Sequence, residues 1–432
     1  MRFADASDGA AHQRRRELAS ILLSCEGKSF WSAKMTQSLA PKTDRLVHLD
    51  VLRGLAVLGL LFARFPAKGG SSLVLEHPDV LGWSAGEQGL WLFNSVMVDD
   101  AMRGLFALLF GVSLWMMTGP REDRSLVPTW TGYLARTAGL FLFGLTFHVI
   151  ALAEASDILH VYALAACGAL ILSRLDARLL LLGGMVGFVL LAAHDFMGDI
   201  TTAPVTSAAL AHAAAEREAG YLAHIMASIQ NFQAWSLSTG IVWKCLEAGS
   251  YMLLGLGLFR IGFFTCLSNE TLALITAAAY GVGLAVCGGV AISLAAGGFM
   301  ESVKAHFLTT LGKPFIVIAH ASLIMLLMRG GFMRTVLTGV LAPVGRMALT
   351  LYLAGSAIAL FAFTGAGLGL GPFDRYEITG LAVLGSLFLI VAARAWLSAF
   401  NQGPFEWALR IWSQKTGGFL VSILPGMRLQ SA

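Results

Sequence analysis

The sequence predicts an all-α protein, a polytopic transmembrane helical bundle of about ten helices. Hydrophobic residues make up 56% of the 432 positions and charged residues 13%, whereas about 25% charged residues is usual for soluble domains. Apolar runs of about 20 residues, long enough to cross a bilayer as a helix, recur almost end to end. The 48 glycines favour close helix packing, because lipid supplies no hydrophobic force between helices.

The expected spans follow from windows of about 20 apolar residues. They lie near residues 50–68, 98–118, 134–154, 156–173, 178–196, 240–264, 271–298, 308–329, 344–366 and 378–399. When Lys and Arg are sorted into alternate loops, most of them gather on the side that holds both termini. Positive residues stay on the cytoplasmic side, so both termini are expected in the cytoplasm and the chain in the inner (plasma) membrane.

The chain is expected to divide into three segments. A basic cytoplasmic tail at 1–44 precedes a transmembrane domain at 45–400, and a cytoplasmic C-terminal tail follows at 401–432. No processed signal peptide is expected. Larger outer segments at 69–98 and 198–239 hold aromatic and ionisable residues, and long ordered segments of this kind tend to hold functional residues. The second of them is expected to contain a helix that lies on the outer face without spanning.

Composition argues against several classes of site. The five cysteines lack the spacing of a metal site or a disulfide framework, so neither a metal nor a covalently bound cofactor is expected. The net charge of +4 is small and concentrated in loops, so membrane lipids are the expected partners and nucleic acid is not. The oligomeric state stays open.

Ionisable residues at membrane depth cost a few kcal/mol, and they therefore indicate a cavity or a partner. Asp50 and Arg53 lie three residues apart at the start of the first span, where they can pair on one helix face. A capped helix entry explains them equally well. We expect both to be buried near Arg346 at the cytoplasmic end of the bundle. Arg64 lies about three turns further along the helix and could extend toward the outer surface.

The first outer segment offers a candidate acid–base residue. His77 follows Glu76 and precedes Asp79, so a carboxylate could orient its imidazole as a general base or acyl acceptor. An ordinary exposed loop histidine is the simpler interpretation. Arg103, at the start of the next span, belongs to the same polar group.

The hairpin between the third and fourth spans holds a denser group, namely His148, Glu154, Asp157, His160 and Tyr162. Two histidines and two carboxylates in so short a segment indicate proton handling, with interface residues held by water as the alternative. We expect His148, Asp157 and His160 to converge on an internal polar cavity, because a carboxylate entering a span needs a partner there. A metal is not expected, because no third helix supplies ligands at a suitable spacing.

Two further polar groups are expected to be structural. Lys244 and Glu247, one turn apart, are expected to form an intrahelical ion pair. A C-terminal set is expected to tie the ends of the bundle together through charge pairs such as Glu406 with Arg410; it comprises Arg346, Thr350, Tyr352, Glu406 and Arg410.

In this order, these groups resemble the YeiB-like family of bacterial inner-membrane proteins, whose C-terminal half carries a domain of unknown function. The likeness covers nearly the whole chain, from Arg45 to Ser413. It rests on five segments: Leu49 to Gly54, Leu109 to Gly111, Asp157 to Leu159 with Tyr162, Gly345 to Thr350 with Tyr352, and Gly403 to Trp407 with Arg410.

The first span of that family resembles the first span of transmembrane acyltransferases, which move acyl groups from a cytoplasmic donor to sugars across the membrane. The resemblance implies acyl-coenzyme A as donor and a small-molecule or glycan acceptor. Catalytic candidates are His77, which loosely matches the loop histidine of one acyltransferase branch, together with His148 and Asp157. The sequence departs at Arg64, where the sugar O-acetylating branch has histidine and YeiB-like proteins usually have asparagine, and at Leu351, where they usually have asparagine.

Two functions therefore remain open. An acyltransferase needs a cavity that reaches from the cytoplasm to His77 or His148, with a cation such as Arg53 or Arg346 near the donor phosphates. A transporter or lipid-handling protein without covalent catalysis needs only a gated polar cavity.

Overall fold

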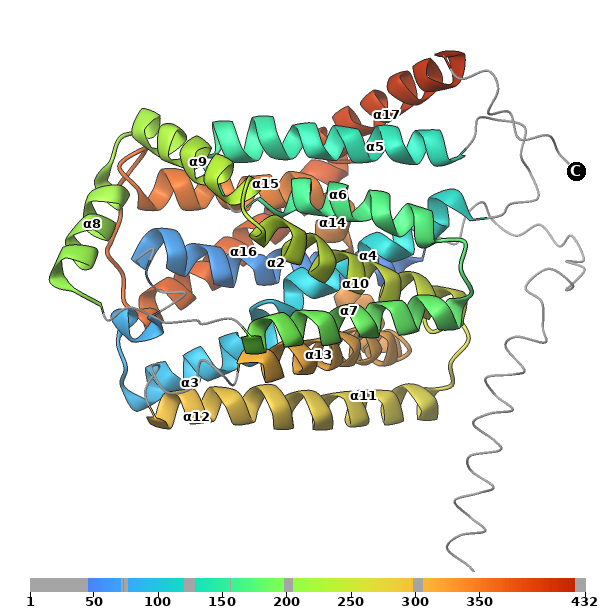
Figure 1. Ribbon diagram of the computed structural model, residues 1–432, viewed down its shortest axis with the longest axis horizontal. Coiled ribbons are helices and arrows are strands. Elements are labelled where there is room, and N and C mark those ends of the chain that lie inside the picture. The colour runs from blue at the N-terminus through green and yellow to red at the C-terminus, as the bar shows by residue number, and fades with distance from the viewer. Residues whose placement is uncertain are drawn as a thin grey trace, which may run out of the picture.

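The computed structural model describes residues 46–70, 73, 77–119, 129–155, 157–197, 205–297 and 306–423. Within these ranges the chain is helical and contains no strand. Figure 1 shows a bundle of roughly parallel helices, with α8 crossing one end of it at the left. The tail expected at 1–44 lies outside the described residues.

The first half of the chain contains α-helices interrupted by short π-helical and 3-10 segments, which carry the label η. Their bounds are α2 (Val47–Phe65), η1 (Pro66–Gly70), η3 (Pro78–Leu81), α3 (Ala85–Phe93), η4 (Asn94–Val98), α4 (Ala101–Thr118), α5 (Thr129–Phe143), η5 (Gly144–Ala151), α6 (Ile158–Leu172) and α7 (Ala177–Met197). Each of the five spans expected in this half coincides with one of these helices.

The second half begins with the two helices of the segment near 198–239, which was expected on the outer side. The bounds are α8 (Ser207–Glu218), α9 (Tyr221–Ser236), α10 (Gly240–Arg260), α11 (Asn269–Gly283), η6 (Leu284–Gly288), α12 (Gly289–Gly297), α13 (His306–Leu327), α14 (Gly331–Arg346), α15 (Ala348–Phe363), α16 (Arg375–Ala399) and α17 (Pro404–Ile423). The span expected at 344–366 is in fact the second arm of a bent pair, because α14 and α15 meet at an angle of 80°. The C-terminal segment expected as a tail contains α17, which packs along α5 (Figure 1).

The helices have the length and composition of a multi-pass membrane protein. Seven helical segments among the described residues are long and apolar enough to cross a membrane, and the bent pair makes an eighth. Two further expected spans are not among these eight. The helix α2 carries three charged residues in 19, and α6 is only 15 residues long. The expected all-α transmembrane bundle is thereby confirmed.

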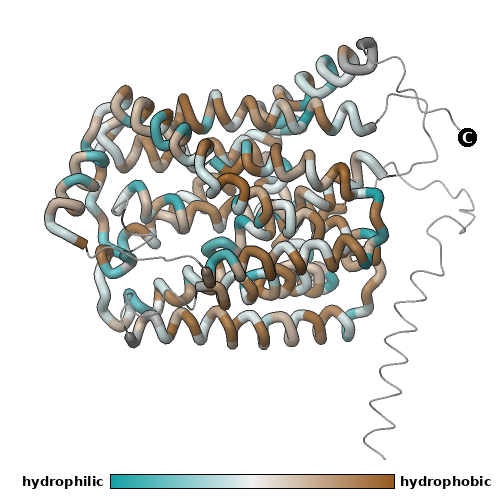
Figure 2. Tube along the Cα trace, in the orientation of Figure 1, coloured by the Kyte–Doolittle hydropathy of each residue, from teal (hydrophilic) through white to brown (hydrophobic). Residues whose placement is uncertain are grey.

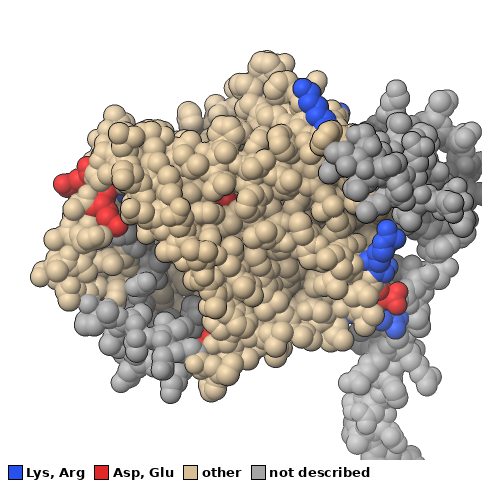
Figure 3. Space-filling view, turned by 45° about the horizontal axis from the view of Figure 1, so that its top comes forward, with Lys and Arg blue, Asp and Glu red and all other residues tan. Residues whose placement is uncertain are grey.

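The outer surface of the bundle is apolar where lipid would touch it. On α16, the side chains of Leu384, Phe388 and Val391 are 61%, 62% and 66% exposed. Hydrophobic residues predominate along the peripheral helices α7 and α11, and hydrophilic ones gather in the segments at the two ends (Figure 2). The face in Figure 3 shows the same pattern, with nearly all its visible charged side chains at the two ends.

The first span forms the centre of the bundle, with α4, α14, α15 and α16 packed against it. Glycine makes the closest of these approaches possible. A Cβ on Gly54 would overlap the carbonyl oxygen of Leu341, and a Cβ on Gly345 would overlap that of Asp50. Small residues at such crossings let backbones touch where lipid provides no hydrophobic force, so α2 and α14 are locked together at the end that carries Asp50 and Arg346.

Candidate functional site

His148 lies at the centre of the most deeply buried polar group. It belongs to η5, the π-helical continuation of α5, and its side chain is fully buried. Short π-helical segments within α-helices often occur at functional sites. One turn earlier, a Cβ on Gly144 would overlap the Oδ2 atom of Asp157, so glycine at that position lets the carboxylate approach η5.

Asp157 joins two histidines through its two oxygens. It is the N-cap of α6, and its Oδ2 accepts hydrogen bonds from the backbone N–H of His160 at 2.9 Å and from His160 Nδ1 at 3.0 Å. Its Oδ1 lies 2.7 Å from His148 Nδ1. Three N–H groups thus converge on one carboxylate, an arrangement that stabilises its negative charge in a buried place. The structure therefore brings His148, Asp157 and His160 together.

The other side of His148 holds two residues from distant helices. Its Nε2 lies 2.8 Å from the hydroxyl oxygen of Ser356 on α15 and 3.2 Å from a guanidinium nitrogen of Arg64 on α2. The same Arg64 nitrogen contacts the Ser356 hydroxyl, and the guanidinium carbon lies 4.6 Å from the centre of the Tyr352 ring. Arg64 therefore points into the bundle, and the expected extension toward the outer surface was wrong.

These contacts define the hydrogen positions on His148. Asp157 accepts only, so Nδ1 carries the hydrogen that it shares with the carboxylate. Arg64 donates only, so Nε2 must carry a lone pair. The geometry thus selects a neutral imidazole whose single Nε2 lone pair faces two donors, and the Ser356 hydroxyl at 2.8 Å is nearer than the Arg64 nitrogen at 3.2 Å. A base held in one tautomer by a carboxylate, with a hydroxyl within reach, is the arrangement that activates a nucleophile.

Sequence reasoning missed Ser356 altogether. It lies four residues after Tyr352, on the same face of α15. The Tyr352 hydroxyl is 3.5 Å from both Asp157 Oδ1 and His148 Nδ1. Serine is common in transmembrane helices, where its hydroxyl usually bonds the preceding turn, so only its spacing from Tyr352 could have singled it out.

His160 has a different environment from His148. Its Nδ1 is taken by Asp157, and its buried Nε2 has no hydrogen-bond partner among the described residues. The rings of Phe141, Phe232 and Trp235 stand edge-on to the imidazole, the nearest at 4.9 Å between centroids. His160 therefore holds Asp157 from an aromatic surround.

A cavity with a volume of about 310 Å³ opens beside this group, between α4, α6, α9 and α10. Asp157 belongs to its lining, whereas His148 and His160 do not. The lining is Arg103, Gly104, Ala107, Ala155, Asp157, Ile158, Val161, Tyr162, Asn231, Trp235, Lys244, Glu247, Ala248 and Tyr251. Asn231 is exposed, so the cavity is reached from the side of α9. His148, Asp157 and His160 were all expected to reach an internal polar cavity, and for the two histidines that prediction was wrong, because only Asp157 lines it. The role of α9 as a wall was not expected.

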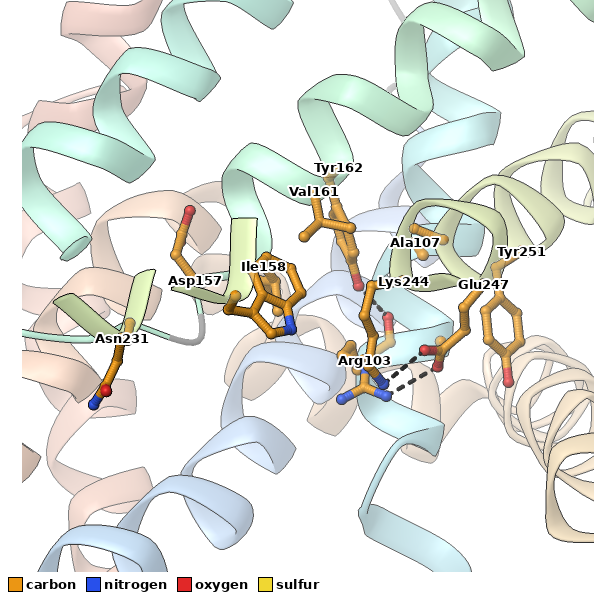
Figure 4. A pocket seen from close by; sticks show the side chains of 14 residues that line it. Arg103, Ala107, Asp157, Ile158, Val161, Tyr162, Asn231, Lys244, Glu247 and Tyr251 are labelled. Atoms are coloured by element: carbon orange, nitrogen blue, oxygen red, sulfur yellow. Dashed lines mark hydrogen bonds and ion pairs between the residues drawn. The ribbon is translucent and has the colours of Figure 1, made fainter. Parts of the chain in front are cut away.

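A charged pair forms one wall of the cavity. Arg103 donates to Glu247 at 2.9 Å and lies 2.7 Å from Asp100. Figure 4 shows Arg103 and Glu247 pointing toward each other from α4 and α10. Lys244 lies 3.1 Å from Glu247, which confirms the expected intrahelical pair. The Tyr162 hydroxyl donates to the backbone oxygen of Arg103 at 2.6 Å.

The helix α9 reaches over the C-terminal end of η5. The hydroxyls of Tyr221 and Ser228 donate to the backbone oxygens of Ala151 and Val149, at 2.6 Å and 2.9 Å. These bonds satisfy carbonyls that the irregular turn leaves open. On the same helix, burial and the nearby Lys68 ammonium lower the pKa of His224, so this imidazole is neutral near pH 7.

Asp50 and Arg53 form the pair expected at the start of the first span. Their side chains meet at 3.1 Å, Asp50 is buried, and Arg53 also donates to the hydroxyl of Ser113 at 2.7 Å. The close approach of Gly345 to the Asp50 carbonyl brings the backbone next to Arg346 near this pair, but no hydrogen bond or ion pair joins the Arg346 side chain to Asp50 or Arg53 among the described residues. Arg346 itself donates to the backbone oxygen of Asn401 at 2.9 Å.

The C-terminal set is built differently from the expectation. Glu406 accepts from the backbone N–H groups of Leu349 at 2.6 Å and Thr350 at 3.1 Å, and from the Thr350 hydroxyl at 2.6 Å. Its carboxylate thus caps the N-terminus of α15, where the positive end of the helix dipole favours a negative charge. The expected charge pair with Arg410 is absent from the contacts of the described residues, and Arg410 is exposed.

His77 shares no side-chain hydrogen bond or ion pair with the His148 group among the described residues. It is buried and precedes η3. Glu76, the carboxylate expected to orient it, lies outside the described residues. Within the described ranges, no group of three or more His, Cys, Asp or Glu side chains is placed to hold a metal ion.

Comparisons with known proteins agree with this architecture. Residues 258–416 match the family described as "Protein of unknown function (DUF418)". The "Uncharacterized protein YxaH" of Bacillus subtilis (strain 168) is 26% identical over 388 residues, covering 85% of this chain and 94% of that protein. The "Uncharacterized protein YeiB" of Escherichia coli (strain K12) is 30% identical over 401 residues, covering 86% and 96%. No solved structure matches the chain. Because the Escherichia coli protein is 30% identical and the alignment covers most of both chains, this chain belongs to the YeiB-like family.

Proposed function

We propose that this protein is a transmembrane acyltransferase that moves an acyl group from cytoplasmic acyl-coenzyme A to an acceptor at the membrane or its outer face. The observation that carries the proposal is His148. Its Nδ1 is held by Asp157 at 2.7 Å, and its Nε2 lone pair lies 2.8 Å from a hydroxyl. A histidine oriented in this way is a general base for the attack of a hydroxyl or amine on a thioester.

The cavity supports an acceptor of moderate size with both polar and apolar faces. Trp235, Tyr162 and Tyr251 offer aromatic surfaces, and Arg103 with Glu247 offers charged hydrogen-bonding groups. A volume of about 310 Å³ lies at the lower end of the roughly 300–1,000 Å³ typical of ligand pockets. A sugar or a short amphiphile fits this description, which agrees with a small-molecule or glycan acceptor.

We further propose an inner-membrane location with both termini in the cytoplasm. Most Lys and Arg residues gather in the loops on the side of the termini, and such residues remain cytoplasmic. The cavity then opens toward the outer face, because α9 belongs to the expected outer segment, so we assign it to the acceptor. It includes neither His77 nor His148, so it is not the cytoplasmic path that the acyl donor needs. Reporter fusions within 205–239 should read as external, and a cytoplasmic signal there would reverse the orientation.

The test of the enzymatic proposal is an assay with radiolabelled acyl-coenzyme A on purified protein, with candidate sugars and amines as acceptors. His148→Ala should lower transfer on the order of 100-fold or more, as expected for the loss of a general base. His77→Ala tests the second histidine, and His212→Ala, whose side chain is 76% exposed, is the matched control. Transfer that persists in His148→Ala at the wild-type rate would exclude this residue as the base.

A transporter or lipid-handling protein is the second candidate, and a broken helix favours it. The regular helix is interrupted between η4 and α4, where Asp100 has a φ of 52°. The ammonium of Lys313 on α13 reaches the carbonyl oxygens of Ser95 and Asp99 at this break, the latter at 2.9 Å. Discontinuous helices whose carbonyl ends face a cation are typical of transporters. If no acyl thioester is consumed, in detergent or in proteoliposomes, this second function is favoured.

A further inference from the structure

Ser356 has the surroundings of a nucleophile. Its hydroxyl oxygen is 2.8 Å from His148 Nε2 and 3.2 Å from the backbone oxygen of Tyr352. A hydroxyl has one hydrogen to donate, and the imidazole is the nearer of these two acceptors. Ser356, His148 and Asp157 therefore form a continuous chain from hydroxyl to base to carboxylate, built from α15, η5 and the N-terminus of α6.

We propose that Ser356 is the nucleophile that carries the acyl group as an ester between two half-reactions. This inference rests on the acyltransferase proposed above and adds a covalent step to it. Three independent features point to it: the hydroxyl-to-imidazole contact, the tautomer imposed by Asp157, and the Arg64 guanidinium placed against the same hydroxyl. A nucleophile, a base within hydrogen-bond reach and a third group that orients the base together define covalent catalysis.

In the first half-reaction, the Ser356 oxygen attacks the carbonyl carbon of the acyl thioester, and its proton moves to His148 Nε2. The carbon–sulfur bond breaks, and the leaving thiolate takes that proton to become a thiol. An ester on Ser356 remains. Asp157 stabilises the imidazolium that forms in between. We assign Arg64 to the oxyanion: its guanidinium starts against the Ser356 oxygen and turns to the adjacent carbonyl oxygen of the thioester as negative charge develops there.

In the second half-reaction, a hydroxyl or amine of the acceptor attacks the ester carbonyl, and His148 Nε2 takes the proton that is lost. The bond between the acyl carbon and the Ser356 oxygen breaks, and the proton returns to that oxygen. No oxidation or reduction occurs, and each proton taken up is released. The enzyme ends each cycle as it began, with the thiol and the acylated acceptor as products.

A stored acyl group fits the size of the neighbouring cavity. That cavity of about 310 Å³ borders Asp157 and not Ser356, and it is near the lower limit for one ligand, roughly 300 Å³, so donor arm and acceptor would not occupy it together. An ester on Ser356 removes the need for both to be bound at once. Arg64 is only partly buried, so its movement is the simplest way to uncover the otherwise buried hydroxyl.

The test is to incubate the purified full-length protein with radiolabelled acetyl-coenzyme A and no acceptor, quench it in acid, and measure label on the protein by gel and intact mass. Wild type should carry one acyl group, and Ser356→Ala none. Ser356→Cys should carry the group as a thioester, which neutral hydroxylamine removes, whereas the wild-type oxygen ester survives that treatment. Ser322→Ala is the control, because Ser322 is also fully buried in a span, on α13, but bonds only Thr276 and its own helix.

The outcomes separate the two proposals. If wild type transfers acyl groups to an acceptor and Ser356→Ala does so within about twofold of it, the covalent step is excluded and direct attack assisted by His148 remains. Label on His148 instead of Ser356 would also overturn it. If wild type neither labels, hydrolyses nor transfers any acyl thioester, the acyltransferase itself is refuted and the covalent step falls with it. Loss of label in Ser356→Ala with full labelling of Ser322→Ala supports both.

Discussion

Two junctions of this bundle bury polar side chains in opposite ways. At the His148 junction, η5, α6, α2 and α15 bring together side chains that bind mainly one another, and His148 keeps a lone pair facing a hydroxyl. At the Glu406 junction, α17 brings a carboxylate to the first turn of α15, where it accepts from two backbone N–H groups and the Thr350 hydroxyl. The His148 junction therefore keeps an imidazole that can accept a proton. At the Glu406 junction the carboxylate charge is stabilised by hydrogen bonds to backbone N–H groups.

The difference shows how to divide residues that look alike in the sequence. Asp157, which is buried, and Glu406, which is partly buried, are both carboxylates near a helix start, and both belong to segments that carry the family resemblance. A carboxylate that serves only backbone groups contributes stability, since those groups would otherwise be buried without partners. A carboxylate that fixes the tautomer of a histidine beside a hydroxyl contributes chemistry. Substitutions at the two junctions should therefore separate activity from stability.

The largest effect is expected from Asp157→Asn. The amide oxygen would take the place of Oδ2, where two donors of His160 need an acceptor. The amide nitrogen would then face His148 Nδ1 as a donor and force the hydrogen onto Nε2, which could no longer accept a proton. Acyl transfer should fall on the order of 100-fold or more with the fold retained. Transfer near the wild-type rate, measured alongside thermal unfolding in detergent, would place both junctions in the structural class.

Glu406→Ala should show the opposite pattern. It leaves the N–H groups of Leu349 and Thr350 without an acceptor, at about 1–3 kcal/mol for each unsatisfied group, so unfolding should become easier by about 2–4 kcal/mol. Transfer per folded molecule should not change. Arg410→Ala on the same helix, at an exposed side chain, should stay within about 0.5 kcal/mol. A large loss of acyl transfer in folded Glu406→Ala would show that the Glu406 junction also contributes to activity and not only to stability.

Gly403→Ala tests whether the Glu406 junction needs the close approach of the backbone at Gly403. A Cβ at that position would overlap the Oε2 atom of Glu406 and lie 2.6 Å from the Thr350 hydroxyl oxygen. Overpacking of this kind costs about 1–3 kcal/mol, so the denaturation midpoint should fall while labelling of Ser356 persists. Gly418→Ala, where a Cβ meets open space, is the matched control on α17. Equal midpoints for the two variants would show that the close approach is not required.

The smallest effect is expected at Lys244. Its side chain is 48% exposed, and Glu247 keeps the Arg103 partner when Lys244 is removed. Lys244→Met should therefore change the free energy of unfolding by less than about 1 kcal/mol. Arg103→Met should cost more, because it removes the cation shared by Asp100 and by Glu247, which lines the cavity. Equal losses of unfolding free energy in the two variants would mean that the cavity wall depends on the Lys244–Glu247 pair as much as on Arg103.

Part of the site could be predicted from the sequence because its residues are close together along the chain. His148, Asp157 and His160 lie within thirteen positions of one another, so a hairpin had to bring them close, and the cost of a buried charge argued that they would meet. The same reasoning failed for Arg64, which was expected to extend outward. The partners of Arg64 come from η5 and α15, and Ser356 lies 292 positions further along the chain. Hydropathy alone does not specify which face of a helix turns inward.

By itself, the sequence determined that this protein is a helical membrane bundle, where most of its helices lie, and which of its polar residues are too costly to be filler. Those properties follow from composition and from apolar runs, which act over single helices. Only the tertiary structure decided that Ser356 faces His148, that Arg103 crosses to Glu247 beside a cavity walled by α9, and that Glu406 caps α15. Each of these depends on how helices far apart in the chain rotate and approach, and in lipid that is decided by close packing and hydrogen bonds between helices.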